Sequence, residues 1–284
     1  MRRLREKWYT IIMAIPLFEM DNIYSTLWNV ILMVFFSLNF LVVPLHISFE
    51  LEQSNYYNSL WFLFHELPIY LLATDIVHSL NTAYYSKGVY VKERKKIIKY
   101  YFKWNFWLDI CILIPLILVL FEIEGLTILH LNFLMITVKL QIITTKLENF
   151  FQFKDKPQGI INLLKLIFKV LSIAHLCGCA WHYIAKWEIS DLEMNNTWLN
   201  YVKVQNDDWQ VRYVNSLYFS IVTMVTVGYG DISPQNTVEK SFSIIIITLS
   251  CGFFAYALNS VGIILKEMYR EDDHFKFIFF IHSF

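Results

Sequence analysis

The sequence predicts an all-α integral membrane protein with six transmembrane helices, arranged as a four-helix domain followed by a two-helix domain. The first observation is composition: 56% of the 284 residues are hydrophobic and 17% are charged, whereas soluble domains average about a quarter charged residues. The second is a set of apolar windows, each near the roughly 20 residues that cross a bilayer. They lie near 25–45, 60–80, 104–121, 126–147, 160–186 and 238–267.

The third observation is the placement of lysine and arginine, which gather on the cytoplasmic side of membrane proteins. Residues 1–24 begin with a basic cluster, and seven further basic residues lie between Lys87 and Lys103. The segments after the first and third windows instead carry glutamates, among them Glu50 and Glu122. We therefore expect a multi-pass protein with both termini in the cytoplasm, and we expect it in the plasma membrane.

Several function classes are disfavoured. The formal net charge is zero, so no bulk basicity points to a nucleic-acid partner. The four cysteines lie inside apolar runs, and the pair Cys177 and Cys179 lacks further ligands at zinc spacing. The loops contain no nucleophile and base set, phosphate cradle or metal cluster. We expect neither an enzyme nor a bound cofactor or resident metal.

One apolar segment is too short to cross a bilayer. A polar stretch at about 188–212 precedes residues 213–224, and the chain then continues Val225-Thr226-Val227-Gly228-Tyr229-Gly230-Asp231. Irregular backbone inside a membrane is tolerated only where protein buries it or where it lines a watery path. Residues 213–231 are therefore predicted to enter the membrane and return on the same side.

This segment has the composition of a potassium selectivity filter. Glycines allow backbone conformations closed to other residues, so successive carbonyls can face one axis and replace the water around K⁺. The predicted filter is Thr226, Val227, Gly228, Tyr229 and Gly230. Asp231 then lies at the pore mouth, where it either concentrates cations or braces the filter. One chain supplies a quarter of such a ring, so a tetramer with three further subunits is expected.

A glycosylation sequon, Asn195-Asn196-Thr197, lies in the segment before the predicted filter. Attached glycans require an extracytoplasmic surface. Asn195 is therefore a glycosylation candidate, and its position agrees with the topology deduced from loop charge.

With these residues identified, the sequence resembles the ether-à-go-go and cyclic-nucleotide-gated superfamily of voltage-gated-like channels. The resemblance rests on 216–231 (SLYFSIVTMVTVGYGD), on 174–182 (AHLCGCAWH), on Asp75 with Asn81-Thr82, and on 106–109 (FWLD) with Pro115. It implies that Tyr218 and Phe219 are aromatic residues of the pore helix that pack behind Tyr229.

The resemblance also implies a domain division. We expect a cytoplasmic N-terminus at 1–24, a voltage-sensor-like domain at 25–153 and a pore domain at 154–267, with 268–284 as a short cytoplasmic tail. The superfamily continues into a cyclic-nucleotide-binding domain, whereas this sequence ends in an apolar run, 275–284. A truncated or divergent tail is expected, and no cyclic nucleotide is expected to bind this chain.

The fourth predicted helix departs from the family pattern. Its every-third-residue ladder contains Lys139, and Lys146 falls outside that ladder. A full sensor moves roughly 3 to 4 charges per subunit, so steep voltage dependence is not supported. Asp75 and Asp109 lie in apolar windows, where an unpaired carboxylate is costly, and Lys139 is the natural partner for either.

Two features of the sequence each have two possible interpretations. Gly252 in the last window is either a family-type hinge or a close-packing glycine, with Tyr256 and Asn259 as candidates to face an inner cavity. The basic segment between Lys87 and Lys103 either reflects positive-inside topology alone or also contacts anionic lipid of the bilayer.

These observations favour a potassium-selective channel subunit with weak voltage sensitivity at most. A poorly selective cation channel is one alternative, and Thr226 at the head of the filter favours potassium over it. A silent or regulatory subunit that needs longer relatives is the other alternative.

Overall fold

The computed structural model describes residues 17–18, 22–49, 66–86, 89–120, 133–151, 158–193 and 195–282. The chain divides into two compact units. The first comprises residues 1–43 and 53–152, and the second comprises residues 44–52 and 153–284. The assignment of these units to a sensor-like and a pore role stays a prediction.

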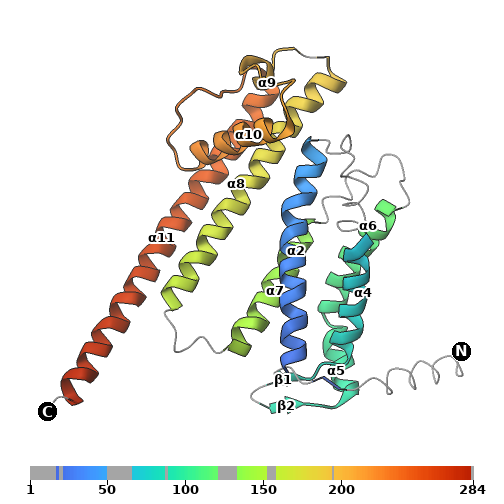
Figure 1. The fold of residues 1–284 in the computed structure, drawn as a ribbon, viewed down its shortest axis with the longest axis vertical. Helices are drawn as coiled ribbons and strands as arrows, with labels where there is room; N and C mark the ends of the chain where they lie inside the picture. Colours follow the sequence, from blue (N-terminus) through green and yellow to red (C-terminus); the bar gives the residue numbers. More distant parts are fainter. Residues whose placement is uncertain are drawn as a thin grey trace, which may run out of the picture. The chain divides into compact units, whose positions relative to one another are not determined.

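The first unit is built from helices and one small hairpin (Figure 1). It contains most of α2 (Ile23–Phe49), then α4 (Leu67–Leu80), α5 (Arg94–Tyr101), α6 (Asn105–Leu120) and α7 (Phe133–Phe151). Helix α6 packs against both α4 and α7. Strands β1 (Tyr84–Ser86) and β2 (Val89–Val91) pair antiparallel, with Tyr85 opposite Tyr90. The sequence did not indicate this hairpin, although aromatic and β-branched residues suit it.

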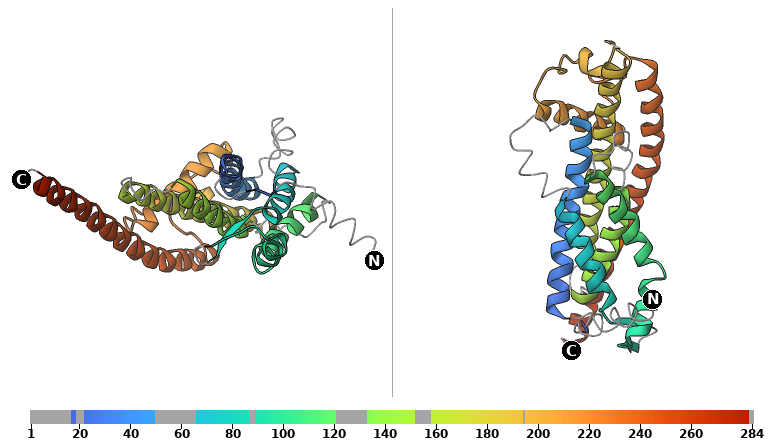
Figure 2. Two further views of the ribbon diagram at one scale, coloured as in Figure 1. Left: turned by 90° about the horizontal axis from the view of Figure 1, so that it is seen from below. Right: turned by 90° about the vertical axis from the view of Figure 1, so that its right-hand side faces the viewer.

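The second unit contains α8 (Gln158–Asp191), α9 (Trp198–Tyr201), α10 (Trp209–Met224) and α11 (Thr237–His282). Helices α8 and α11 run side by side in opposite directions, and α10 packs against both (Figures 1 and 2). The end of α2, from Pro44 to Phe49, belongs to this unit. At about 1.5 Å per residue, α11 is about 69 Å long, far longer than the roughly 30 Å hydrocarbon core. It ends at His282 rather than near 267.

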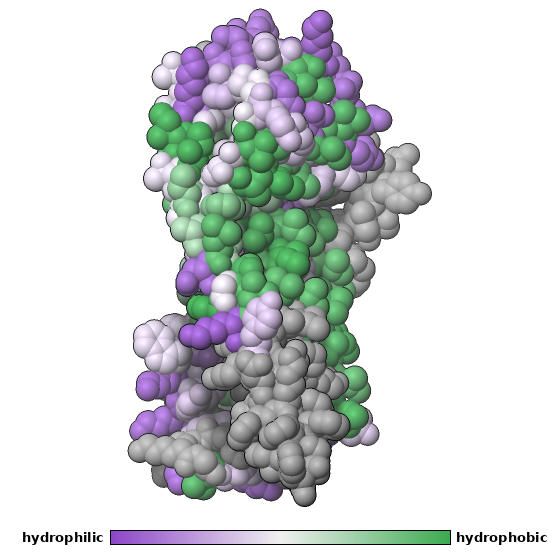
Figure 3. Space-filling view, turned by 90° about the vertical axis from the view of Figure 1, so that its left-hand side faces the viewer, coloured by the Kyte–Doolittle hydropathy of each residue, from purple (hydrophilic) through white to green (hydrophobic). Residues whose placement is uncertain are grey.

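Three described helices are long and apolar enough to cross a membrane: α2, residues 161–191 of α8 and residues 237–266 of α11. The pair α5 and α6 is a fourth candidate, bent by 56° at its break. The windows near 60–80 and 126–147 begin at residues outside the described ranges, and the six-span count stays a prediction. One face of the molecule shows apolar side chains over a broad band below a hydrophilic upper end (Figure 3).

An aromatic core holds the second unit together at its filter-bearing end. Trp181 of α8 is fully buried and stacks on Phe219 of α10, with ring centroids 4.2 Å apart. Trp198 of α9 and Phe242 of α11 lie parallel to the same indole, at 5.8 and 6.2 Å. Residues from four helices therefore fix the position of α10.

Helix α10 approaches α8 most closely at Gly178. A Cβ atom at this position would lie 3.2 Å from the backbone nitrogen of Leu217 and 3.3 Å from its Cα. Because both atoms belong to the backbone, they cannot turn aside as a flexible side chain does. The glycine within 174–182 thus has a packing role that the sequence did not reveal.

Substituting Gly178→Val is expected to lower stability by about 1 to 3 kcal/mol, the usual cost of overpacking. The measurement is the thermal denaturation midpoint of the purified, detergent-solubilised protein. Gly262→Val in α11 is the matched control, because a Cβ at Gly262 meets nothing within 4 Å in the chain. Equal midpoints for the two variants would contradict the role assigned to Gly178.

Candidate functional site: a pore loop with unpaired carbonyls

The segment predicted to be re-entrant consists of helix α10 and the irregular chain that follows it. Helix α10 has 16 residues and is about 24 Å long, shorter than the bilayer core. Its C-terminus is closed by two hydrogen bonds, Thr226 N–H to the Thr223 carbonyl at 3.1 Å and Val227 N–H to the Val222 carbonyl at 3.0 Å. This is the Schellman pattern, with Thr226 in the left-handed position that glycine usually occupies.

Thr226 therefore has a strained backbone. Its φ is 60°, a conformation that is an outlier for a β-branched residue and that costs roughly 1 to 2 kcal/mol. Such strain persists where surrounding structure imposes it, and it clusters at functional sites. Here it directs the chain out of the helix and into the predicted filter.

Backbone conformation alternates along the filter. The φ angles of Thr226, Gly228 and Gly230 are 60°, 58° and 78°, whereas Val227 and Tyr229 do not have positive φ. Left-handed residues therefore alternate with ordinary ones over these five positions. Gly228 and Gly230 adopt these angles without the cost that a side chain would add.

The carbonyl oxygens from Thr226 to Gly230 have no partner in the chain. Within the described residues, none of the five accepts a hydrogen bond. All five residues are exposed in the single chain, and Tyr229 retains 72% of its surface. A row of carbonyls without partners in the chain is available to replace the hydration shell of a cation.

Tyr218 braces the end of this segment. Its hydroxyl donates a 2.8 Å hydrogen bond to Oδ2 of Asp231. This bond lowers the pKa of the Asp231 carboxyl and raises the pKa of the Tyr218 hydroxyl. Of the two roles weighed for Asp231, the geometry supplies the contact that bracing requires.

Phe219 takes part in a different contact. It packs on Trp181, and within the described part of the chain neither Phe219 nor Tyr218 is in ring contact with Tyr229. Packing of these aromatics behind Tyr229 therefore stays a prediction for an assembly of several chains.

A buried polar clamp joins three helices beside the loop. Asn236 Oδ1 accepts the Glu239 N–H at 2.9 Å and so caps α11. The Glu239 carboxylate accepts the N–H of Trp198 at 2.9 Å and of Gln235 at 2.8 Å. The Asn236 amide also donates to Glu188 Oε2 at 2.9 Å. The end of α8, the start of α9 and the start of α11 are thereby fixed together.

Two histidines of α8 make structural contacts. His182 is fully buried, stacks on Phe49 at 3.8 Å and lies 2.8 Å from the Ser48 carbonyl through Nδ1. His175 Nδ1 lies 2.9 Å from the Tyr213 hydroxyl. Among the described residues, no group of three or more His, Cys, Asp or Glu side chains could hold a metal ion.

The remaining pore candidates lie on α11 and before α9. Gly252, Tyr256 and Asn259 are exposed in the chain and share one face, since residues four and seven apart align on a helix. Helix α11 continues through Gly252 without interruption, so the hinge stays a prediction. Asn195 is exposed, whereas Thr197 of the same sequon is buried.

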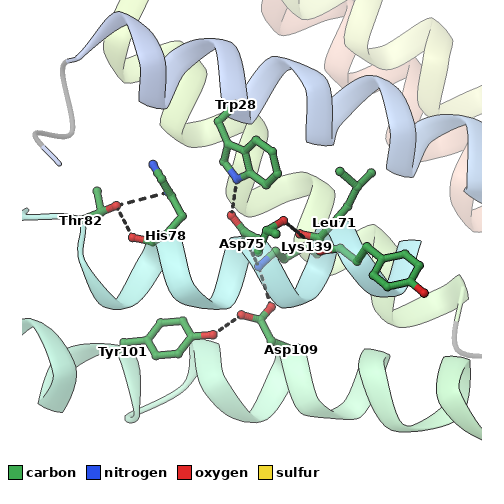
Figure 4. A network of polar contacts seen from close by, with 10 residues as sticks. Trp28, Leu71, Asp75, His78, Thr82, Tyr101, Asp109 and Lys139 are labelled. Carbon is green, nitrogen blue, oxygen red and sulfur yellow. Dashed lines mark hydrogen bonds and ion pairs between the residues drawn. The ribbon is translucent and has the colours of Figure 1, made fainter. Parts of the chain in front are cut away.

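In the first unit, Lys139 joins two buried carboxylates (Figure 4). Its Nζ lies 2.7 Å from Asp75 Oδ2 and 2.6 Å from Asp109 Oδ1, and Lys139 is 5% exposed. Helices α4, α6 and α7 thus each contribute one charge. The sequence left open which carboxylate pairs with Lys139, and the structure shows that both do.

The outer oxygens of these carboxylates are also occupied. Trp28 Nε1 donates to Asp75 Oδ1 at 3.0 Å, and the Tyr101 hydroxyl donates to Asp109 Oδ2 at 2.5 Å. Lys146, two helical turns beyond Lys139, interacts electrostatically with Asp75. Because α7 is an α-helix, Lys146 faces the same side as Lys139, although it misses the every-third-residue ladder.

Several of these residues were missed by sequence reasoning. Trp28 and Tyr101 look like ordinary aromatics of apolar or interfacial segments, and no local pattern identifies their distant partners. Asn236 and Glu239 do carry a signal, because a cap residue followed three positions later by glutamate is typical of a helix start.

The family model described as "Ion channel" matches residues 176–267. This range includes α10, the predicted filter and the first 31 residues of α11, up to the predicted span end. A short helix followed by a run of carbonyls without partners in the chain is the arrangement expected of an ion-channel pore loop. In fold and in the geometry of this site, residues 176–267 are therefore similar to an ion channel.

Similarity to named proteins narrows this class. The human voltage-gated delayed rectifier potassium channel KCNH5 is 24% identical over 284 residues, covering 89% of this chain and 27% of that protein. The rice potassium channel AKT2 is 28% identical over 212 residues, covering 72% of this chain and 24% of that protein. The rice potassium channel KOR2 is 32% identical over 139 residues, covering 44% of this chain and 19% of that protein. The chain is thus related to voltage-gated-like potassium channels, as its motifs indicate, and spans about a quarter of their length or less.

Removing the Lys139 charge with Lys139→Met is expected to lower stability by about 3 to 5 kcal/mol, because two facing carboxylates then lose their shared partner. The measurement is the denaturation midpoint in detergent. Adding Asp109→Asn to Lys139→Met is expected to recover part of the loss, since one buried charge is removed. A double variant no more stable than Lys139→Met would contradict the proposed charge balance.

Removing the Tyr218 hydroxyl with Tyr218→Phe is expected to raise the pKa of Asp231 toward the ordinary value of about 3.9. At pH values above this ordinary pKa, the native hydrogen bond contributes its full stabilisation. That stabilisation is lost as the pH falls through the lower pKa that Asp231 has in the folded protein. The stability difference between native protein and variant should therefore shrink in acid. Denaturation midpoints measured against pH test this, with the exposed Tyr201→Phe as control.

Proposed function

We propose that four copies of this chain form a potassium-selective pore in which Thr226 to Gly230 coordinate dehydrated K⁺. The observation that carries the proposal is the run of five carbonyls without a hydrogen-bond partner, on a backbone of alternating φ. One chain offers one side of a coordination shell, and three further subunits complete it. The named relatives are potassium channels, which supports this ion.

The proposal includes six membrane crossings with both termini in the cytoplasm. The exposed face of α11 that carries Gly252, Tyr256 and Asn259 then lines the inner pore. Exposure of that face in the single chain agrees with a surface that faces water or other subunits.

We further propose weak voltage sensitivity. Helix α7 carries two basic residues, Lys139 and Lys146, whereas a full sensor uses roughly 3 to 4 charges per subunit, each worth about 2.3 kcal/mol per 100 mV. A silent subunit remains the second candidate, because the same depletion of charge suits a chain that assembles with longer relatives.

The test is the reversal potential of the purified protein in bilayers with K⁺ on one side and Na⁺ on the other. Each tenfold preference for K⁺ shifts that potential by about 59 mV. Gly228→Ala is expected to move it toward zero, because alanine at φ 58° costs roughly 1 to 2 kcal/mol. Gly262→Ala is the matched control, since a Cβ meets nothing within 4 Å at either glycine and Gly262 is helical.

A native reversal potential at zero would reject K⁺ selectivity in favour of a poorly selective channel. Absence of current from correctly inserted protein, with current restored by co-expression of a longer relative, would favour the silent subunit.

A further inference from the structure

We propose that α5 and the bend that joins it to α6 bind the phosphate-bearing headgroups of anionic lipids in the membrane. This surface, named here the basic elbow, comprises Lys95, Lys99, Phe102, Lys103, Trp104 and Trp107. The inference goes beyond ion conduction, and its test does not require a conducting channel.

The bend places α5 outside the hydrocarbon core. Helix α6 is apolar, whereas α5 has the sequence RKKIIKYY, and each lysine or arginine at the bilayer centre costs roughly 2.5 to 3.5 kcal/mol. The two helices meet at an angle of 56°. A basic α5 at the membrane surface, followed by an apolar α6 that crosses the membrane, agrees with the composition of both helices.

The lysine stripe, as named here, consists of two exposed lysines on one face of α5, Lys95 and Lys99, and of Lys103 in the bend that follows Tyr101. Lys95, Lys99 and Lys103 follow one another at intervals of four and are all exposed, and within the described residues none of the three is ion-paired. Like charges at this spacing repel each other. Residues 92–104 hold six basic residues and one acidic residue, a net charge of +5. An anion bound along the stripe relieves that repulsion.

Exposed aromatic side chains follow the stripe in the sequence, in the bend and the first turn of α6. Trp104 is 74% exposed and Trp107 is 60% exposed, and Phe102 lies against Phe106 with centroids 4.4 Å apart. Tryptophan favours the headgroup level of a bilayer. Positive-inside topology alone accounts for the lysines, but it does not account for exposed tryptophans at the same bend.

The opposite face of α5 is fixed to the protein. Ile97 and Tyr101 are buried, and the Tyr101 hydroxyl is bonded to Asp109 across the bend. Tyr100 stacks on Tyr84 of the hairpin, with centroids 4.1 Å apart. The lysine stripe is therefore presented at a set angle, and little ordering is needed when a headgroup binds.

The experiment uses the full chain in bilayers of neutral phosphatidylcholine that contain a brominated phospholipid, which quenches nearby tryptophans. Brominated phosphatidylserine or phosphoinositide is expected to quench more than brominated phosphatidylcholine at equal mole fraction. This excess of quenching by the anionic lipid should disappear in Trp104→Phe/Trp107→Phe, and its loss there would assign the quenching to the basic elbow. The excess should also fall with added salt.

Lys95→Gln/Lys99→Gln/Lys103→Gln is expected to weaken the association about fivefold for each lysine removed. The charge-matched control is Lys169→Gln/Lys240→Gln/Lys266→Gln, whose lysines are exposed on α8 and α11; it should retain the excess. Equal quenching by neutral and anionic lipid in the native protein would overturn the proposal, as would an unchanged excess in the elbow variant. Binding of soluble inositol polyphosphate without any lipid excess would also reject the lipid assignment.

Discussion

The unpaired carbonyls from Thr226 to Gly230 are the constraint on which the second unit depends. A peptide carbonyl buried without a partner costs free energy comparable to a lost hydrogen bond, so these five, exposed in the single chain, need water or a cation as partner wherever other subunits cover them. The backbone must also be held in a conformation that it would not choose, since Thr226 lies in the left-handed region. The neighbouring contacts all position α10 and the chain that follows it. Gly178 allows α10 to lie close to α8, Phe219 packs on Trp181, and Tyr218 donates a hydrogen bond to Asp231.

The first unit obeys the same rule with charges in place of carbonyls. A buried charge must be paired and hydrogen-bonded, and the Lys139 ammonium meets this condition through Asp75 and Asp109. Trp28 and Tyr101 then occupy the remaining carboxylate oxygens. The network thereby ties α2, α4 and the α5–α6 bend to α7. Such a network specifies one arrangement of the helices even where a hydrophobic core of equal volume would be as stable.

What could be predicted from the sequence follows from how local each signal is. The predicted filter is a contiguous run of five residues between apolar segments, so its position and its proposed chemistry follow from a local signal without coordinates. Lys139, Asp75 and Asp109 were identified as partners because a charge in an apolar window needs one. Trp28 and Tyr101 were not identified, since their sequence separations from Asp75 and Asp109 carry no pattern. The packing role of Gly178 and the φ of Thr226 depend on where the chain lies in space, and no composition or periodicity encodes them.

A comparison of magnitudes connects the charge network to gating. Moving one elementary charge through 100 mV supplies about 2.3 kcal/mol. Separating Lys139 from its partners leaves two buried carboxylates facing each other, at a cost on the order of 3 to 5 kcal/mol, and the one following basic residue on α7, Lys146, lies two turns away rather than one. In a helix with a charged residue at every third position, the next cation takes the vacated place and the cost largely cancels. Here the electric field across the membrane would have to supply the whole cost by acting on one or two charges. We therefore propose that the network holds the helices in one arrangement, and this is the physical ground for proposing weak voltage sensitivity.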